Sequence, residues 1–156
     1  MEQDASLTRG RFLRWAGASM GVATAVGLPR LAEAAEPSAA EKANLKVVAD
    51  FCASFAGRDM AKIAAFLADD CVYRIVETAP PARGKKDSVE RIRSYVERST
   101  KIELKILQSW ANGPIVMNER IDSFEPAIPG SPFHLTGVFF VRDGKIAEWT
   151  DYLIRP

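Results

Sequence analysis

Residues 133–154 read FHLTGVFFVRDGKIAEWTDYLI, and the way this stretch divides into strands and a turn decides the fold. Segments rich in β-branched and aromatic residues stand on both sides of Asp143-Gly144, a dipeptide that favours the tight turn of a β-hairpin. The stretch therefore predicts two antiparallel strands, over residues 133–142 and 145–154.

Two more strands are predicted immediately before this hairpin. Ile102, Leu104 and Ile106 alternate with charged residues, which is typical of a half-buried strand over residues 102–110. Asn112-Gly113 then marks a turn into a strand over 114–124. Four consecutive strands joined by short connections predict one antiparallel sheet.

The chain before these strands is mainly helical. Between residues 43 and 56, apolar residues recur at intervals of three and four, which predicts an amphipathic helix that Gly57 ends. The elements expected next are a short helix capped by Asp59, a strand over 71–76, a loop over 78–85 and a third helix opened by Asp87 or Ser88. This order predicts an α+β domain, residues 43–156, with a curved, mainly antiparallel sheet wrapped around three helices.

Residues 1–35 have the layout of an export signal. Three arginines precede an apolar run over residues 16–28, and an Ala-x-Ala sequence, Ala32-Glu33-Ala34, precedes a cut expected after Ala34 or Ala35. The stretch from Thr8 to Arg14 resembles a twin-arginine motif in which Gly10 replaces the second arginine, so twin-arginine and general secretion both remain open. We expect a protein exported to the periplasm or secreted, with no membrane anchor once the signal is removed.

The rest of the chain is electrically balanced. Of 21 basic and 20 acidic residues, four and three respectively fall in residues 1–35, so equal numbers remain. This balance argues against nucleic acid as a partner. Residues 36–42 are expected to form a short polar lead-in to the domain.

Charged residues on two of the predicted strands suggest a site. Side chains alternate between the two faces of a strand. Arg120 and Asp122 therefore share one face of their strand, and Trp149 and Asp151 share one face of theirs. If both strands belong to one sheet, a guanidinium and two carboxyl groups meet in an apolar pocket. Two close carboxyl groups do not ionise equally, so one can act as an acid and the other as a base. The alternative is a solvated ion-pair network on the sheet surface.

Other polar residues give weaker signals. His134, the only histidine, stands without a partner motif and is interpreted as a structural or surface residue. Cys52 and Cys71 fit either a disulfide or two buried thiols. One histidine and two distant cysteines predict no transition-metal site. Trp110 is a candidate pocket residue or a core aromatic.

The element order and a set of motifs resemble the nuclear-transport-factor-2-like (NTF2-like) cone fold, and within it the limonene epoxide hydrolase family. The matching residues are Tyr73, Glu119-Arg120-Ile121-Asp122, Gly137-Val138-Phe139, Asp143-Gly144-Lys145-Ile146 and Trp149-Thr150-Asp151-Tyr152. The resemblance covers about residues 43–153.

The resemblance implies one-step hydrolysis of a small apolar epoxide without a metal or cofactor. Asp151 would be the base that takes a proton from water, and Asp122 the acid that protonates the epoxide oxygen. Arg120 would lie between them, and Tyr73 would position the water. The residues expected to contact the substrate are Trp149, Ile75, Asn118 and Phe124.

The chain departs from the family at one position. An asparagine that helps to hold the water in the family is replaced by Ile75. Strand alternation predicts that Ile75 points inward with Tyr73 and that Glu77 follows on the same face. Glu77 and Asn118 are therefore candidate substitutes as water ligands.

Three functions remain open. Besides the epoxide hydrolase, the residues suit a ketosteroid-isomerase-like or polyketide-cyclase-like enzyme, in which one aspartate is the base and Tyr73 a neutral donor. The loss of the asparagine at Ile75 also favours a small-ligand-binding protein without catalysis. A homodimer is a further expectation.

Overall fold

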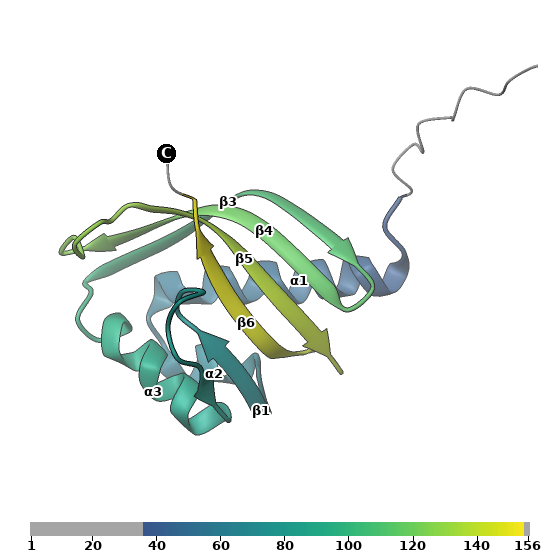
Figure 1. Ribbon diagram of the computed structural model, residues 1–156, viewed down its shortest axis with the longest axis horizontal. Coiled ribbons are helices and arrows are strands. Elements are labelled where there is room, and N and C mark those ends of the chain that lie inside the picture. Colours follow the sequence, from purple (N-terminus) through teal and green to yellow (C-terminus); the bar gives the residue numbers. More distant parts are fainter. Residues whose placement is uncertain (1–35, 155–156) are drawn as a thin grey trace, which may run out of the picture. The chain divides into compact units, whose positions relative to one another are not determined.

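The structure is a computed structural model that describes residues 36–154 (Figure 1). Its helical elements are α1 (Ala39–Ser54), the 3₁₀ turn η1 (Phe55–Gly57), α2 (Met60–Ala65) and α3 (Lys85–Val96). Its strands are β1 (Leu67–Arg74), β2 (Ala82–Arg83), β3 (Lys101–Asn112), β4 (Ile115–Glu125), β5 (Phe133–Arg142) and β6 (Lys145–Leu153). The expected export signal lies outside the described residues. Within residues 36–154, no helix is long and apolar enough to span a membrane.

Helix α1 begins earlier than expected. It starts at Ala39, inside the stretch interpreted as a polar lead-in, because Ser38 and Glu41 form a capping box. The Glu41 backbone N–H donates to Ser38 Oγ at 3.2 Å, and the Ser38 N–H donates to Glu41 Oε2 at 2.7 Å. This reciprocal pair satisfies N–H groups that the first helical turn leaves free, so it fixes the helix start ahead of the apolar pattern.

The segment around α2 and α3 differs from the prediction in two details. Asp59 caps α2 as expected, with its carboxylate accepting from two backbone N–H groups. Helix α3 begins at Lys85 rather than at Asp87 or Ser88, after Gly84 with a φ of 83°. Residues 78–85, interpreted as a loop, also contain the two-residue strand β2, which pairs with β1.

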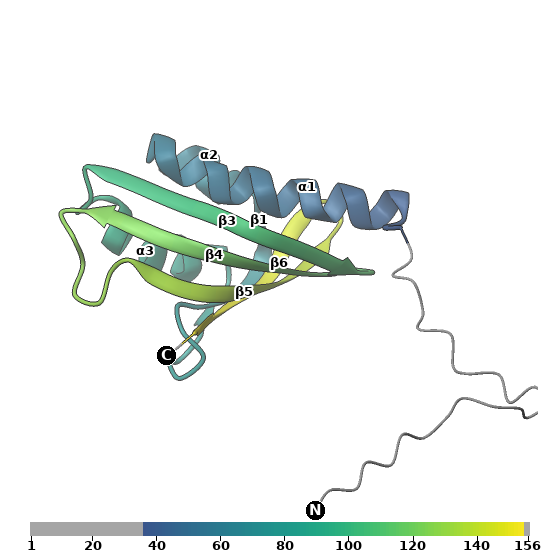
Figure 2. The ribbon, with the colours of Figure 1, turned by 90° about the horizontal axis from the view of Figure 1, so that it is seen from above.

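The sheet has the strand order β2-β1-β6-β5-β4-β3. Its pairs are antiparallel except for β1 and β6, which run parallel. Figures 1 and 2 show a curved sheet with α1 lying along one face of it and α3 near β1. The expected mainly antiparallel, curved sheet is therefore present.

The hydrophobic core fills the space between α1 and the inner face of the sheet. Phe51 of α1 packs edge-on against Trp149, with ring centroids 5.1 Å apart, and against Phe139 at 6.3 Å. Phe55 also packs edge-on against Trp149, at 6.2 Å. The guanidinium carbon of Arg120 lies 5.8 Å from the Phe139 ring centroid and 5.7 Å from that of Trp149, so this aromatic core borders the polar residues of β4.

Candidate active site

The inner face of β4 carries three polar residues. Asn118 and Arg120 are fully buried and Asp122 is 6% exposed. Alternation along the strand turns Glu119 to the opposite face, where its carboxylate bonds His134 Nε2 at 2.7 Å. The alternative of a solvated network on the sheet surface is wrong, because the guanidinium lies in the interior.

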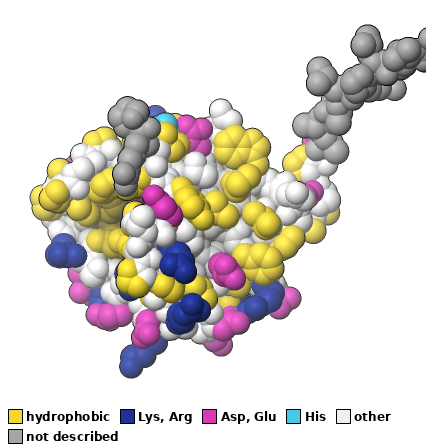
Figure 3. All heavy atoms as spheres, in the orientation of Figure 1, with side chains coloured by type: hydrophobic (Ala, Val, Ile, Leu, Met, Phe, Trp, Pro, Cys, Tyr) yellow, Lys and Arg dark blue, Asp and Glu magenta, His cyan; other side chains and the backbone are white. Residues whose placement is uncertain are grey.

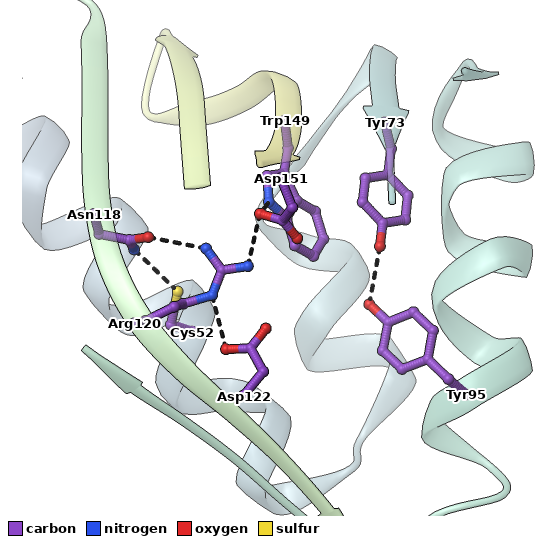
Figure 4. Close-up of polar contacts among 8 residues, drawn as sticks. All are labelled: Cys52, Tyr73, Tyr95, Asn118, Arg120, Asp122, Trp149 and Asp151. Atoms are coloured by element: carbon purple, nitrogen blue, oxygen red, sulfur yellow. Dashed lines mark hydrogen bonds and ion pairs between the residues drawn. The ribbon is translucent and has the colours of Figure 1, made fainter. Parts of the chain in front are cut away.

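Arg120 is the centre of a hydrogen-bond network (Figure 4). Its Nε donates to Asp122 Oδ1 at 2.9 Å, and its Nη2 donates to Asp151 Oδ1 at 2.7 Å. Its Nη1 donates to Asn118 Oδ1 at 2.9 Å. Asn118 in turn donates to Cys52 Sγ of α1 at 3.6 Å. One guanidinium therefore joins the two carboxyl groups, as the strand faces predicted.

Gly137 gives the guanidinium the space it occupies. This glycine of β5 pairs with Asn118 on one side and with Asp151 on the other. A Cβ atom built on Gly137 would lie only 2.1 Å from Arg120 Nη1. The strand between β4 and β6 must therefore lack a side chain at this point for the network to form.

The two carboxyl groups have different hydrogen-bond environments. Asp151 Oδ1 accepts two N–H donors, from Arg120 and from Trp149 Nε1 at 2.7 Å. Among the residues that the structure describes, Asp122 accepts one such bond, from Arg120 Nε. Hydrogen bonds to the charged form of a carboxyl group favour ionisation. The geometry thus makes Asp151 the better-stabilised carboxylate and Asp122 the group that keeps a proton more readily.

The electrostatic environment is consistent with this difference. Burial raises the pKa of Asp122 to about 6, against the opposing effect of Arg120. Burial also raises the pKa of Asp151, opposed by Arg120 and by its hydrogen bonds from Arg120 and Trp149. Although burial opposes the charge of Arg120, the two carboxylates raise the pKa of this arginine above its usual value. The network therefore holds a permanent cation and a readily retained proton.

A cavity of about 290 Å³ adjoins the network. Asp122 and Asp151 reach it from β4 and β6, and most of its remaining lining is apolar or aromatic. Tyr73 stacks on Trp149 with ring centroids 4.2 Å apart, and both line the cavity. The candidate site is therefore a largely apolar chamber with two carboxyl groups in its wall.

Tyr95 of α3 also lines this cavity and was missed as a site residue. Its hydroxyl oxygen lies 3.3 Å from that of Tyr73, within hydrogen-bond distance (Figure 4). The sequence places it in the predicted third helix and gives no sign of a functional role. Helical periodicity does not reveal whether a tyrosine hydroxyl faces a cavity or a packed core.

The expected substrate contacts are only partly brought together. Trp149, Phe124 and Ile75 line the cavity, whereas Asn118 does not. The Asn118 side chain is enclosed by its bonds to Arg120 and Cys52 instead.

The inward alternation expected after Tyr73 is not maintained. Strand β1 ends at Arg74, so Ile75 lies beyond it, 39% exposed at the cavity wall. Glu77 follows in the loop and is not among the cavity-lining residues, because strand periodicity no longer applies there. Glu77 and Asn118 are therefore not placed as ligands for water in the cavity.

Four other residues noted in the sequence lie outside the cavity. Trp110, a candidate pocket residue, is 45% exposed on the outer face of β3. His134 is half-exposed and paired with Glu119, in keeping with a surface role. Cys52 and Cys71 are buried free thiols. Within residues 36–154, no cluster of three or more histidine, cysteine, aspartate or glutamate residues is arranged to hold a metal ion.

Known proteins share both the fold and the sequence pattern. The family model of the limonene-1,2-epoxide hydrolase catalytic domain matches residues 42–154. A solved structure of an M. tuberculosis LEH-like epoxide hydrolase is 29% identical, with a TM-score of 0.63 over 73% of this chain and 84% of that chain.

Two more distant structures support the fold alone. A Kribbella flavida protein provisionally named a ketosteroid isomerase is 21% identical, with a TM-score of 0.60 over 74% of this chain and 81% of that one. An NTF2-like protein of unknown function from Mesorhizobium loti is 15% identical, with a TM-score of 0.63 over 77% and 98%. The expected α+β, NTF2-like fold is confirmed. Because its family model spans most of the sequence, this chain belongs to the limonene-1,2-epoxide hydrolase catalytic domain family.

Proposed function

We propose that this protein is a cofactor-independent hydrolase that adds water to a small apolar epoxide. The observation that carries the proposal is the unequal pair of carboxyl groups on one buried guanidinium, at the wall of an apolar cavity. Two N–H groups donate to Asp151 and stabilise its ionised form, which suits a base. The raised pKa of Asp122 lets this carboxyl group keep its proton, which suits an acid. Such a difference between paired carboxyl groups is how enzymes assign acid and base roles.

The proposed reaction proceeds in one step. The oxygen of a cavity water attacks an epoxide carbon while Asp151 removes one of its protons. The carbon–oxygen bond of the ring breaks, and Asp122 transfers its proton to the departing oxygen. The product is a diol, and the pair ends with its proton on Asp151 instead of Asp122. Transfer of this proton back to Asp122, through solvent, restores the starting state.

Arg120 supports both roles electrostatically. Its charge stabilises ionised Asp151 before the reaction and the Asp122 carboxylate after proton transfer. Because the guanidinium is hydrogen-bonded on all three nitrogens, it needs little reorganisation when the charge moves. The bonds from Trp149 and Arg120 both end on Asp151 Oδ1, so Oδ2 has no hydrogen bond within residues 36–154 and is free to accept the proton.

The substrate class follows from the cavity. A volume of about 290 Å³ with mainly aliphatic and aromatic walls suits a compact hydrocarbon skeleton. Limonene 1,2-epoxide and cyclohexene oxide are therefore suitable first probes. In water labelled with oxygen-18, the wild-type protein should give a singly labelled diol. Binding of an epoxide without any turnover would contradict the proposal and favour the non-catalytic alternative.

The reaction should depend on pH through the shared proton. Because Asp122 must be protonated, we expect kcat/KM to fall as pH rises through about 6, the raised pKa of this carboxyl. It should also fall at low pH, when Asp151 becomes protonated, and the two limbs belong to the coupled pair. A pH–rate profile that is flat between about pH 5 and about pH 9 would contradict this prediction.

A second candidate function is proton transfer at the α-carbon of a ketone. The contact between the Tyr73 and Tyr95 hydroxyls favours it, because neutral hydroxyl donors can stabilise an enolate oxygen while Asp151 acts as the base. Deuterium exchange at the α-carbon of a cyclic ketone, without diol formation from epoxides, would identify this activity.

We also propose that the protein forms a homodimer through the outer face of the sheet. Four large hydrophobic residues there are between 37% and 45% exposed: Trp110, Ile115, Met117 and Phe140. Trp110 pairs with Met117 and Ile115 with Phe140, so they form one patch. Figure 3 shows that hydrophobic side chains are exposed among polar ones on the face of the molecule that it views. Such patches commonly mark interfaces, and a symmetric pair would cover both copies.

A charge in this patch should prevent association. We expect Met117→Lys to convert a dimer into a monomer in sedimentation velocity, because a buried unpaired ammonium is costly. Ala53→Lys adds the same charge at an exposed position of α1 and should leave the dimer intact. A monomeric wild-type protein at all accessible concentrations would refute the proposed dimer.

Export remains a proposal as well. It rests on the basic start, the apolar run and the Ala-x-Ala end of residues 1–35. Detection of the mature protein in the periplasmic fraction, with a new N-terminus near residue 36, would support it.

A further inference from the structure

We infer that Tyr95 acts with Tyr73 to hold the attacking water, an inference that rests on the proposed epoxide hydrolysis. Ile75, in the cavity wall just after β1, has no group that can bond a water. Neither Glu77 nor Asn118 reaches the cavity. The polar side chains that do line it, besides the two carboxyl groups, are Tyr73, Tyr95, Ser94 and Arg98.

The Tyr95 ring is fixed by packing on two sides. It stacks on Phe55, with ring centroids 6.3 Å apart and planes inclined by 5°, and it meets Phe124 edge-on at 5.9 Å. These contacts hold its hydroxyl 3.3 Å from that of Tyr73, which is itself held by stacking on Trp149. The two hydroxyl groups therefore form a preorganised pair contributed by α3 and β1.

Only one of the two tyrosine O–H groups is used in the hydrogen bond between Tyr73 and Tyr95. A hydroxyl group has one donor and two acceptor positions, so one tyrosine donates to the other and the second keeps a free O–H. The hydroxyl that has donated its proton presents only lone pairs to a third molecule, as an amide oxygen would. In a mainly apolar cavity, the free O–H needs an acceptor, and a water molecule or a substrate oxygen can provide it.

A nucleophilic water needs both a hydroxyl oxygen that accepts a hydrogen bond and a free O–H that donates one. One of its protons goes to Asp151, and its second proton requires another acceptor so that a lone pair points at the substrate. The O–H of a single tyrosine can take either of two orientations in the ring plane, whereas the paired hydroxyls restrict each other. Burial and the Asp151 carboxylate raise the pKa of both tyrosines, so they remain protonated and serve as neutral ligands.

The test compares the chain's three tyrosines as phenylalanine variants, with limonene 1,2-epoxide and cyclohexene oxide as probes. Tyr95→Phe should lower kcat on the order of a hundredfold with little change in KM, by analogy with the loss of one catalytic hydrogen bond. Tyr73→Phe should do the same. The double variant should lose little more than either single variant, because the hydroxyls act as a unit. Tyr152→Phe, exposed on the outer face of the sheet, is the matched control and should retain full activity.

A rescue variant separates positioning from packing. An amide at position 75 would offer the cavity an acceptor and a donor, so Ile75→Asn in the Tyr95→Phe background should raise kcat roughly tenfold. Unchanged kcat in Tyr95→Phe would overturn the inference while leaving the proposed function standing. A loss that Ile75→Asn does not repair would assign Tyr95 a packing role and overturn it too. Absence of turnover in the wild-type protein would overturn both.

Discussion

Asp151→Asn should reduce diol formation on the order of ten-thousandfold, the upper range for loss of a general base. The asparagine has nearly the same shape, and its amide oxygen can still accept from Arg120 and Trp149, as Asp151 Oδ1 does. It cannot, however, take a proton from water. The fold should therefore persist while the chemistry is lost.

The same substitution should also affect the acid. The charge of Asp151 helps to raise the pKa of Asp122, so its removal lowers that pKa and leaves a smaller fraction of Asp122 protonated at any pH near neutrality. Asp122→Asn removes only the acid, because Asp151 keeps its two N–H donors and stays a base. We thus expect Asp151→Asn to have the larger effect, and Asp122→Asn a loss of roughly a thousandfold.

Rates of labelled diol formation under single-turnover conditions check these expectations. Asp70→Asn is the matched control, because Asp70 lies exposed on β1, bonds Arg142 at the surface and does not line the cavity. It should hydrolyse epoxides at the wild-type rate. If Asp122→Asn or Asp151→Asn turned over normally, the assigned acid–base pair would be wrong.

The second large effect is expected for Gly137→Ala. The added methyl group would stand 2.1 Å from Arg120 Nη1, 2.7 Å from Phe139 Cε2 and 2.8 Å from Asn118 Oδ1. Real Cβ atoms essentially never show contacts under 3.0 Å, so a neighbour must move. Arg120 is fully buried and bonded on three nitrogens, which leaves the guanidinium no free direction.

Two measurements should change together in this variant. Overpacking of this kind costs about 1–3 kcal/mol of the free energy of unfolding, visible as a lower midpoint in urea. A guanidinium displaced by about 1 Å should also lower kcat on the order of a hundredfold, measured where the variant is still folded. If the cause is a short-range steric clash, Gly137→Val should lower both the stability and kcat more than Gly137→Ala.

Gly57→Ala is the control for the glycine substitution itself. A Cβ atom on Gly57 would meet nothing within 4 Å, and its backbone is not in the left-handed region. This variant should keep the wild-type stability within a few tenths of a kcal/mol and the full activity. Wild-type stability and rate in Gly137→Ala would show that Arg120 is not confined as the geometry indicates.

The sequence predicted the C-terminal half of the fold best. Strand β5 has the expected bounds because Asp143-Gly144 fixes the hairpin turn locally, and no distant contact is needed to place it. The parallel pairing of β1 with β6 is different. It joins residues 67–74 to residues 146–150, far apart in the chain, and no local pattern specifies such a partner.

Two of the misplaced boundaries have identifiable reasons. The start of α1 was placed too late because the apolar pattern was followed instead of the capping sequence from Ser38 to Glu41. The end of β1 was placed too late because Ile75 and Val76 favour strands intrinsically, whereas the chain turns after Arg74. Because the strand was extended too far, its alternation wrongly placed Glu77 on the same inward face as Tyr73.

Part of the site was readable from side-chain alternation. The period of two placed Arg120 with Asp122, and Trp149 with Asp151, on faces that the structure buries. Which aspartate holds the proton could not be predicted, because this depends on how many N–H groups donate to each carboxyl group. The steric role of Gly137 and the hydroxyl contact of Tyr95 likewise depend on neighbouring strands and helices in three dimensions.

The position of Gly137 between Asn118 and Asp151 has a consequence for how the molecule acquires its native state. Strand β4 alone brings Arg120 and one carboxyl group to the interior, and Arg120 Nη2 gains its acceptor, Asp151 Oδ1, only when β6 aligns beyond β5. A chain with β6 detached would leave a buried guanidinium N–H without a partner beneath α1, which penalises partly assembled forms. Maturation of catalytic competence should thus coincide with the final docking of the last strand, all or none.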